Sequence, residues 1–263
     1  MKNAALIVTF LFAAGAAQAG WFDECEHRAH RSAQIDMAGV SHVVVIAKAG
    51  SLRVEGRDGV RTVAASGEAC SSDEDVLRDI TLTATRSGST ATIEAHVPSL
   101  NGWSFFGGSN AALDFTVTLP SNVSVDIDDT SGGMTVVNVG TCSIDDTSGE
   151  IDVRRVHGDL TIRDTSGAII VEDVAGGVHI PRDTSGEIEV RRVGGGVAID
   201  EDSSGAVTIS NVKRNVFIGH KGSGSIYVSD VGGDFTVDHK GSGGVDYVRV
   251  AGHVSIPERR HRR

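Results

Sequence analysis

A column of aspartates is the first feature of the sequence that could do chemistry. One aspartate recurs two residues before a Ser-Gly pair in five successive segments, and a lysine takes the same place in the next two segments. Stacked carboxylates repel one another, so a hard cation such as calcium could sit between them. The column consists of Asp129, Asp146, Asp164, Asp183 and Asp202, followed by Lys221 and Lys240.

Turn chemistry is the alternative for this column. Asp, Thr and Ser side chains accept hydrogen bonds from nearby backbone N–H groups and are common in bends. The Gly-Gly-x-Gly-x-Asp pattern of calcium-binding repeats is absent from the sequence. We therefore favour a structural turn, and predict no metal ligand and no cofactor at this column.

Two groups of histidines also have metal-like spacing. Cys25, His27 and His30 form one group, but Cys25 is better used in a disulfide. His220 and His239 recur one segment apart, each directly before a lysine whose ammonium group would repel a cation. We expect the second pair to be exposed turn residues, and predict no metal site in either group.

An aromatic segment between glycines is unusual in a chain with only 5% aromatic residues. Trp103, Phe105 and Phe106 could form a contact loop for a glycan, a protein partner or a membrane surface. They could instead fold over an open end of the protein as a plug. The plug is the interpretation favoured here, and the three aromatic residues are the candidate ligand-contact site.

Internal repetition is the strongest signal in the sequence. A Ser-Gly pair recurs seven times with spacings of 17, 18, 19, 19, 19 and 19 residues. Five columns of apolar residues follow these pairs at fixed offsets, and β-branched side chains dominate them. The first column holds Met134, Ile151, Ile169, Ile188, Val207, Ile226 and Val245.

Offsets of two residues within the columns indicate strands with alternate side chains facing inward. Each repeat holds two short strands around a Gly-containing bend such as 156–159, which is too little chain for a βαβ unit. The prediction is an all-β fold, a single-stranded parallel β-solenoid with about 19 residues per coil and ~4.8 Å between coils. Its crossovers are expected to be right-handed.

Charged outward positions are expected to fix the register of the coils. Arg155, Asp173 and Arg192 fall in one column on successive coils, and the column beside them alternates in the same way. Opposite charges that alternate along the stack favour this pairing and penalise a slip by one coil.

The chain divides into four parts by pattern. Residues 1–19 form an export signal, with Lys2, an apolar run and the small-x-small pattern Ala17-Gln18-Ala19 before the cleavage site. Residues 20–120 are a β region that starts and caps the solenoid, residues 121–258 are the repeats, and residues 259–263 are a basic tail. We expect a protein of the periplasm, cell surface or extracellular space, without a transmembrane segment.

Export places the three cysteines in an oxidising compartment, where one disulfide and one leftover thiol are expected. Cys142 falls in the fourth apolar column and should act as a small buried hydrophobe. Cys25 and Cys70 then remain as the disulfide pair. The formal net charge of −11 argues against a nucleic-acid partner.

The repeat Asp-Thr-Ser-Gly-x-apolar-x-apolar resembles domain-of-unknown-function family 4097, which comprises bacterial adhesin-like proteins with a β-solenoid fold. The matching stretches are 146–153 and 183–190, and the early Cys25 and the Gly-Glu-Ala-Cys segment ending at Cys70 are also similar. The resemblance covers roughly residues 40–256. It implies the solenoid and, through an inference from shape, an adhesin-like function.

Function is predicted from what the motifs lack as well as what they contain. No nucleophile elbow, phosphate loop or paired zinc motif is visible, and the short loops between repeats offer little to wall a cleft. We predict no catalytic residue and a non-catalytic, adhesin-like binding protein, whose partner is an unknown envelope protein or glycan. A structural protein that self-associates end to end is the alternative, and a glycan-active β-helix enzyme is a third hypothesis.

Overall fold

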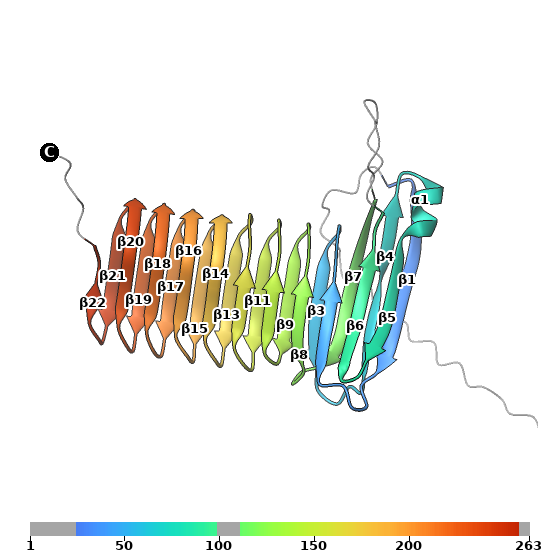
Figure 1. Cartoon of the computed structure of the whole chain (residues 1–263), viewed down its shortest axis with the longest axis horizontal. Coiled ribbons are helices and arrows are strands. Elements are labelled where there is room, and N and C mark those ends of the chain that lie inside the picture. Colours follow the sequence, from blue (N-terminus) through green and yellow to red (C-terminus); the bar gives the residue numbers. More distant parts are fainter. Residues whose placement is uncertain (1–24, 99–110, 258–263) are drawn as a thin grey trace, which may run out of the picture.

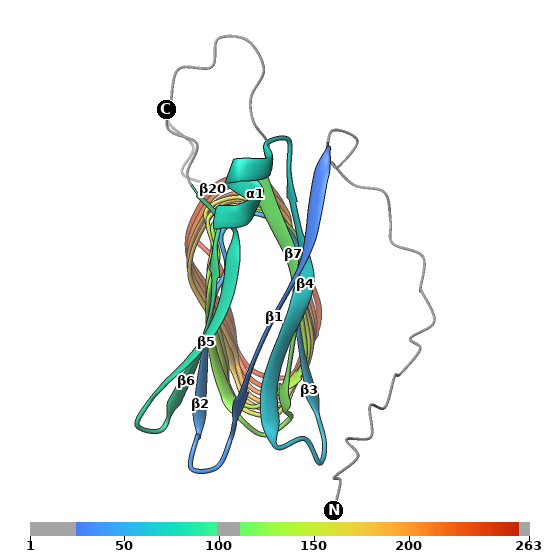
Figure 2. The ribbon, with the colours of Figure 1, turned by 90° about the vertical axis from the view of Figure 1, so that its right-hand side faces the viewer.

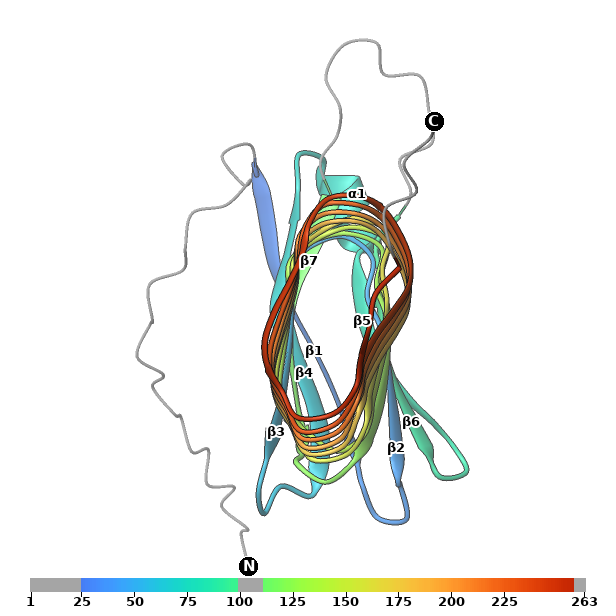
Figure 3. The ribbon, with the colours of Figure 1, turned by 90° about the vertical axis from the view of Figure 1, so that its left-hand side faces the viewer.

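Two sheets face each other along the whole length of the molecule (Figure 1), in a computed structural model that describes residues 25–98 and 111–257. The predicted export signal, the aromatic segment with Trp103, Phe105 and Phe106, and the basic tail lie outside the described residues. Viewed from its C-terminal end, the solenoid is a flattened ring (Figure 3).

Each sheet contains eleven strands within the described ranges. Sheet A runs β1 (His27–Asp36), β4 (Thr62–Ser71), β7 (Ala111–Pro120), β3 (Leu52–Arg57), β9 (Met134–Val139), β11 (Ile151–Val156), β13 (Ile169–Val174), β15 (Ile188–Val193), β17 (Val207–Val212), β19 (Ile226–Val231) and β21 (Val245–Val250). Sheet B runs β5 (Thr81–Ser87), β6 (Thr90–His96), β2 (His42–Ile46), β8 (Ser124–Asp128), β10 (Cys142–Asp145), β12 (Leu160–Arg163), β14 (Val178–Ser185), β16 (Val197–Ser204), β18 (Val216–Ser223), β20 (Phe235–Ser242) and β22 (Val254–Ser255).

The repeats pair in parallel and in the predicted register. Ile151 lies beside Ile169, which lies beside Ile188, so each apolar column of the sequence becomes a row of neighbours in the core. Ile151 and Ile162, which stand for the two sheets of one coil, are fully buried. The predicted all-β parallel solenoid is confirmed.

The glycine of each Ser-Gly pair is required by its backbone. These seven glycines have φ between 100° and 151°, a region that side chains with a Cβ rarely adopt. A Cβ on Gly186, for example, would overlap the carbonyl oxygen of Gly167 one coil away. The most regular signal in the sequence therefore marks a place where the next coil leaves no room for a Cβ atom.

A second column has a left-handed backbone without glycine. One residue on each of seven strands of sheet A has φ between 55° and 62°, directly before a valine that is buried on six of these strands and half-buried on β21: Asn138, Arg155, Asp173, Arg192, Asn211, Asp230 and Arg249. This residue breaks the alternation of the strand, so that Val156 faces inward three positions after Val153. The valines that follow the left-handed residues form the third of the five apolar columns. Their offset of three residues from the second column follows from this conformation.

Antiparallel strands and one helix close the N-terminal end (Figure 2). β1 pairs with β4, β4 with β7, and β5 with β6, all antiparallel. Helix α1 (Glu74–Asp79) is capped by Asp73 and buries Leu77, and Arg31 donates to the carbonyl oxygens of Leu77 and Ile80 at 2.8 and 2.6 Å. α1 is the only helix among the described residues, and it is too short to cross a membrane.

The predicted disulfide is present and ties this end together. Cys25 is bonded to Cys70 on β4, with 5.8 Å between their Cα atoms. Cys142 is free and buried, as the repeat alignment predicts.

The first coil of the chain is not the first coil of the stack. β2 lies between β6 and β8, and β3 lies between β7 and β9. The link from β7 to β8 therefore passes this coil. A side-chain hydrogen bond also joins β3 to β9, because Asn138 donates to the carbonyl oxygen of Gly56 at 2.7 Å. The position of this coil inside the stack is a finding of the structure.

Candidate functional site

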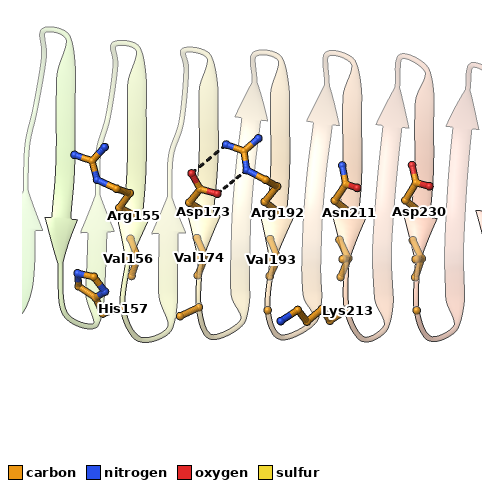
Figure 4. Close-up of a pocket in the computed structure, with 15 residues that line it drawn as sticks. Arg155, Val156, His157, Asp173, Val174, Arg192, Val193, Asn211, Lys213 and Asp230 are labelled. Carbon is orange, nitrogen blue, oxygen red and sulfur yellow. Dashed lines mark hydrogen bonds and ion pairs between the residues drawn. The ribbon is translucent and has the colours of Figure 1, made fainter.

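A groove of about 930 Å³ runs along the edge of sheet A, across β11, β13, β15, β17 and β19 (Figure 4). Each coil contributes the same three positions: the left-handed residue, the buried valine after it, and the next residue. The left-handed residues form one wall, and the residues that follow the valines form the other. The groove is thus a consequence of the repeat and crosses the strands along the axis of the solenoid.

The walls of the groove are uneven in size and charge. Ala175, Gly194 and Gly232 leave one wall low, whereas His157 and Lys213 project from it at separate coils. Each strand beneath the groove lies between two paired neighbours, so side chains are the main groups that a ligand can reach.

Two carboxylates of the groove are neutralised by arginines of the next coil. Arg192 donates to both oxygens of Asp173 at 2.5 and 3.0 Å, and this pairing holds the pKa of Asp173 below its usual value. Arg249 does the same for Asp230 at 2.5 and 2.7 Å, with the same effect on its pKa. The predicted alternation of charge along this column is confirmed for Asp173 and Arg192, and the pair of Asp230 and Arg249 extends it to later coils.

The neighbouring column, which holds Arg154, Glu172 and Arg191, follows the predicted alternation only in part. Arg191 lies 3.9 Å from Glu172 of the coil before, as the alternation predicts, but 3.0 Å from Glu189 on its own strand. Arg154 instead binds both oxygens of Asp152 on its own strand, at 2.8 and 2.7 Å. The reason is proximity, because residues two apart on one strand lie on the same face.

Three polar groups of the groove have no such partner. The side chains of Arg155, Asn211 and Lys213 are exposed and make no ion pair or hydrogen bond with a side chain or backbone group of the described residues, although the charge of Arg155 helps to lower the pKa of Asp173 and of Glu55. Arg155 follows Asn138 in its column, so the coil before it offers no carboxylate. Lys213 lies three coils away from Arg155, a separation of about 14 Å from the usual strand spacing.

The aspartate column lies inside the solenoid rather than in a solvated turn. Its five members are 0–3% exposed, and they stack in register, as Asp183 does with Asp202. Their turn chemistry is present: the N–H of Thr130 donates to Asp129, and the N–H of Thr165 donates to Asp164, each at 2.7 Å. Asp129, Asp146 and Asp164 lie directly after a strand, as the turn prediction requires, whereas Asp183 and Asp202 lie within β14 and β16. The sequence does not reveal the burial of the column.

Burial changes the acidity of this column. Loss of hydration raises the pKa of Asp129 and Asp164 to about 7, and the charge of Asp146 adds to both effects. Burial and the charge of Asp202 raise the pKa of Asp183 to about 6. The Oδ2 atoms of Asp129 and Asp164 are buried without a hydrogen-bond partner among the described groups.

The other candidates of the sequence do not form a metal site in the described part of the chain. No group of three or more His, Cys, Asp or Glu there is arranged to hold a metal ion. His220 and His239 are exposed, with ring centroids 6.0 Å apart. Burial raises the pKa of the Cys142 thiol to about 12, which keeps it protonated and unreactive.

The groove is the site that the sequence did not predict. Its short loops indicate no cleft, yet the left-handed residues provide a wall without any loop. A signal was available: Asn or Asp precedes the valine column in four of the seven coils, and these residue types tolerate a left-handed backbone best.

Comparison with known proteins places the chain among distant structural neighbours only. A candidate adhesin from Bacteroides fragilis has 10% identity and a TM-score of 0.41, covering 88% of this chain and 98% of its own. A candidate lipid-binding protein from Parabacteroides distasonis has 12% identity and a TM-score of 0.37, covering 85% and 98%. A candidate cell adhesion protein from Clostridium sporogenes has 11% identity and a TM-score of 0.34, covering 88% and 99%.

No family model matches the chain, and no curated protein matches it. The resemblance to domain-of-unknown-function family 4097 therefore stays a prediction. These neighbours are too remote to assign a ligand to this chain.

Proposed function

We propose that this chain is an exported, non-catalytic, adhesin-like protein that binds an extended partner of the cell envelope along the groove of sheet A. The observation that carries the proposal is the groove itself, with exposed Arg155 and Asn211 on one wall and exposed Lys213 on the other, none of them in an ion pair or hydrogen bond among the described residues. Strand pairing fixes the backbone positions of these residues before binding, which lowers the entropic cost of association.

Export is part of the proposal because of the leader pattern and the disulfide between Cys25 and Cys70. A non-catalytic role is supported by the pairing of the groove's carboxylates. Asp173 and Asp230 are each held by an arginine, which lowers their pKa and removes them as general acids or bases near neutral pH.

Retention of the purified chain on envelope material of the producing cells tests this function. We expect the wild type to bind and the triple variant Arg155→Gln, Asn211→Ala, Lys213→Gln to lose binding with an unchanged melting temperature. The double variant Arg163→Gln, Arg182→Gln removes the same charge from sheet B and should bind normally. Equal binding by the triple variant would remove the groove from the function.

Self-association is a second candidate function, and the C-terminal coil supports it. Val245 and Val250, which occupy columns that are fully buried elsewhere, are half-buried on β21, and Tyr247 is 50% exposed. The N-terminal end is closed by α1, β1 and β5 (Figure 2). Two copies would therefore meet tail to tail as a closed pair rather than as a filament.

A further inference from the structure

The groove lining has one more cationic than anionic side chain, although the protein as a whole has a formal net charge of −11. Asp173 and Asp230, the acidic members of the lining, are paired with Arg192 and Arg249, and Arg192 also contacts Glu172. Arg155 and Lys213 make no ion pair among the described residues, although the charge of Arg155 acts on Asp173 and on Glu55. A ligand in the groove therefore meets two cations that are in no ion pair and the free amide of Asn211.

The conformation of Arg155 supports a binding role for that side chain. Its φ of 57° is a left-handed value that is unfavourable for arginine, whereas Asn138 and Asn211 occupy the same position with less strain. Arg192 and Arg249 also have this conformation, and both hold an aspartate of the preceding coil. Arg155 holds none, so its strain is not offset by an ion pair within the described structure.

Resting on the proposed function, we infer that the ligand of the groove is an anionic polysaccharide. One acidic group would pair with Arg155 and another with Lys213 about 14 Å further along, so the ligand must be an extended chain. Its hydroxyl groups would bond to Asn211 and to the outer edges of the two Asp–Arg pairs.

Two other polymers fit the groove less well. A peptide strand that joins a sheet needs a free edge, but the groove crosses strands that each lie between two paired neighbours. A single-stranded nucleic acid needs aromatic platforms for its bases, and the lining contains no Trp, Tyr or Phe among the described residues. A polysaccharide needs neither.

Calorimetric titration of the purified exported chain with polygalacturonate fragments tests the inference. The matched ligand is the same preparation with its carboxyl groups reduced to alcohols. We expect the charged fragments to bind and the reduced fragments to bind at least about tenfold more weakly. Raising the salt concentration should weaken the binding of the charged form only.

Two variants locate the binding. Arg155→Gln and Lys213→Gln should each weaken binding of polygalacturonate about tenfold, whereas Arg163→Gln, an exposed arginine of β12 on sheet B, should leave it unchanged. Equal binding of charged and reduced fragments would overturn the inference, as would preferential binding of polyglutamate.

The outcomes separate this inference from the function on which it rests. If polygalacturonate fails to bind, but the wild type still retains envelope material and the groove variants do not, the polysaccharide class is wrong and the groove function stands. If the groove variants retain envelope material as well as the wild type does, both proposals fail.

Discussion

The ammonium nitrogen of Lys221 lies 2.7 Å from Oδ2 of Asp202, and the two side chains are 1% and 0% exposed. The pair sits at the end of the buried aspartate column, where the next coil replaces a carboxylate by a cation. The desolvation of both charges opposes their attraction, so the pair is expected to add little net stability while making each partner depend on the other.

Removing one member of this pair should be costly. Lys221→Met leaves Asp202 as an unpaired buried carboxylate, and we expect a loss of about 3–5 kcal/mol in the free energy of unfolding. The double variant Lys221→Met, Asp202→Asn should recover most of it. Urea denaturation measures both, and Lys240→Met, at the partly exposed next position, is the control. Equal stability of the single and double variants would contradict the coupling.

Stability should fall as the pH rises from about 4 to about 7. The folded-state pKa is raised from 3.8 to about 7 for Asp129 and Asp164 and to about 6 for Asp183. The folded state therefore binds protons more tightly than the unfolded state. The stability that these protons contribute is fully present below pH 3.8 and is lost as the pH rises to about 7. We expect a lower melting temperature at pH 8 than at pH 5 by circular dichroism.

Asparagine at these positions should remove that dependence. The triple variant Asp129→Asn, Asp164→Asn, Asp183→Asn keeps the shape of each side chain without its charge. We expect it to gain about 2 kcal/mol or more over the wild type at pH 8 and much less at pH 5. A gain that is the same at both pH values would show that the carboxylates do not titrate in this window.

The close approach of the coils predicts that alanine substitutions at two glycines differ sharply in their effect on stability. Gly186→Ala places a methyl group against the carbonyl oxygen of Gly167 at a φ of 151°, and should cost about 3 kcal/mol. Gly133→Ala meets no atom within 4 Å and has no left-handed backbone, so it should be neutral or slightly stabilising. Thermal melting of the two variants gives the comparison, and similar losses would contradict the stacking of the coils.

Replacing Arg155 should raise the stability of the fold and weaken ligand binding. Arg155→Asn relieves the left-handed strain without breaking an ion pair, and should stabilise the fold by up to about 1 kcal/mol while weakening ligand binding. Arg192→Asn relieves the same strain but breaks the bidentate pair with Asp173, so no gain is expected. Denaturation curves distinguish them, and equal gains would mean that the ion pair does not matter.

The exposed end of the core predicts concentration-dependent association. If copies meet tail to tail, sedimentation of the wild type should show a monomer–dimer equilibrium and no larger species. Tyr247→Asp places a charge where the ring now packs edge-on against Phe235 at 6.1 Å, and should shift the equilibrium to monomer. Tyr227→Asp, an exposed tyrosine on β19, is the control. A wild type that stays monomeric at high concentration would dismiss this candidate.

The sequence by itself determined the solenoid, the register of its coils and the disulfide. Apolar columns such as Ile151, Ile169 and Ile188 recur at a constant spacing, and only parallel stacking buries every column at once. The pairing of Cys25 with Cys70 followed because the same columns assign Cys142 to the core. These features are periodic or local, which is why they are visible in one dimension.

The tertiary structure alone decided three other features. The coil of β2 and β3 sits between coils formed later in the chain, because strands with the same inward pattern can pair in more than one spatial order. The aspartate column faces the core, since the direction of a side chain in a bend depends on backbone angles that its residue type does not fix. The groove arises because one left-handed residue per coil aligns with the next, and that alignment exists only when the coils are stacked.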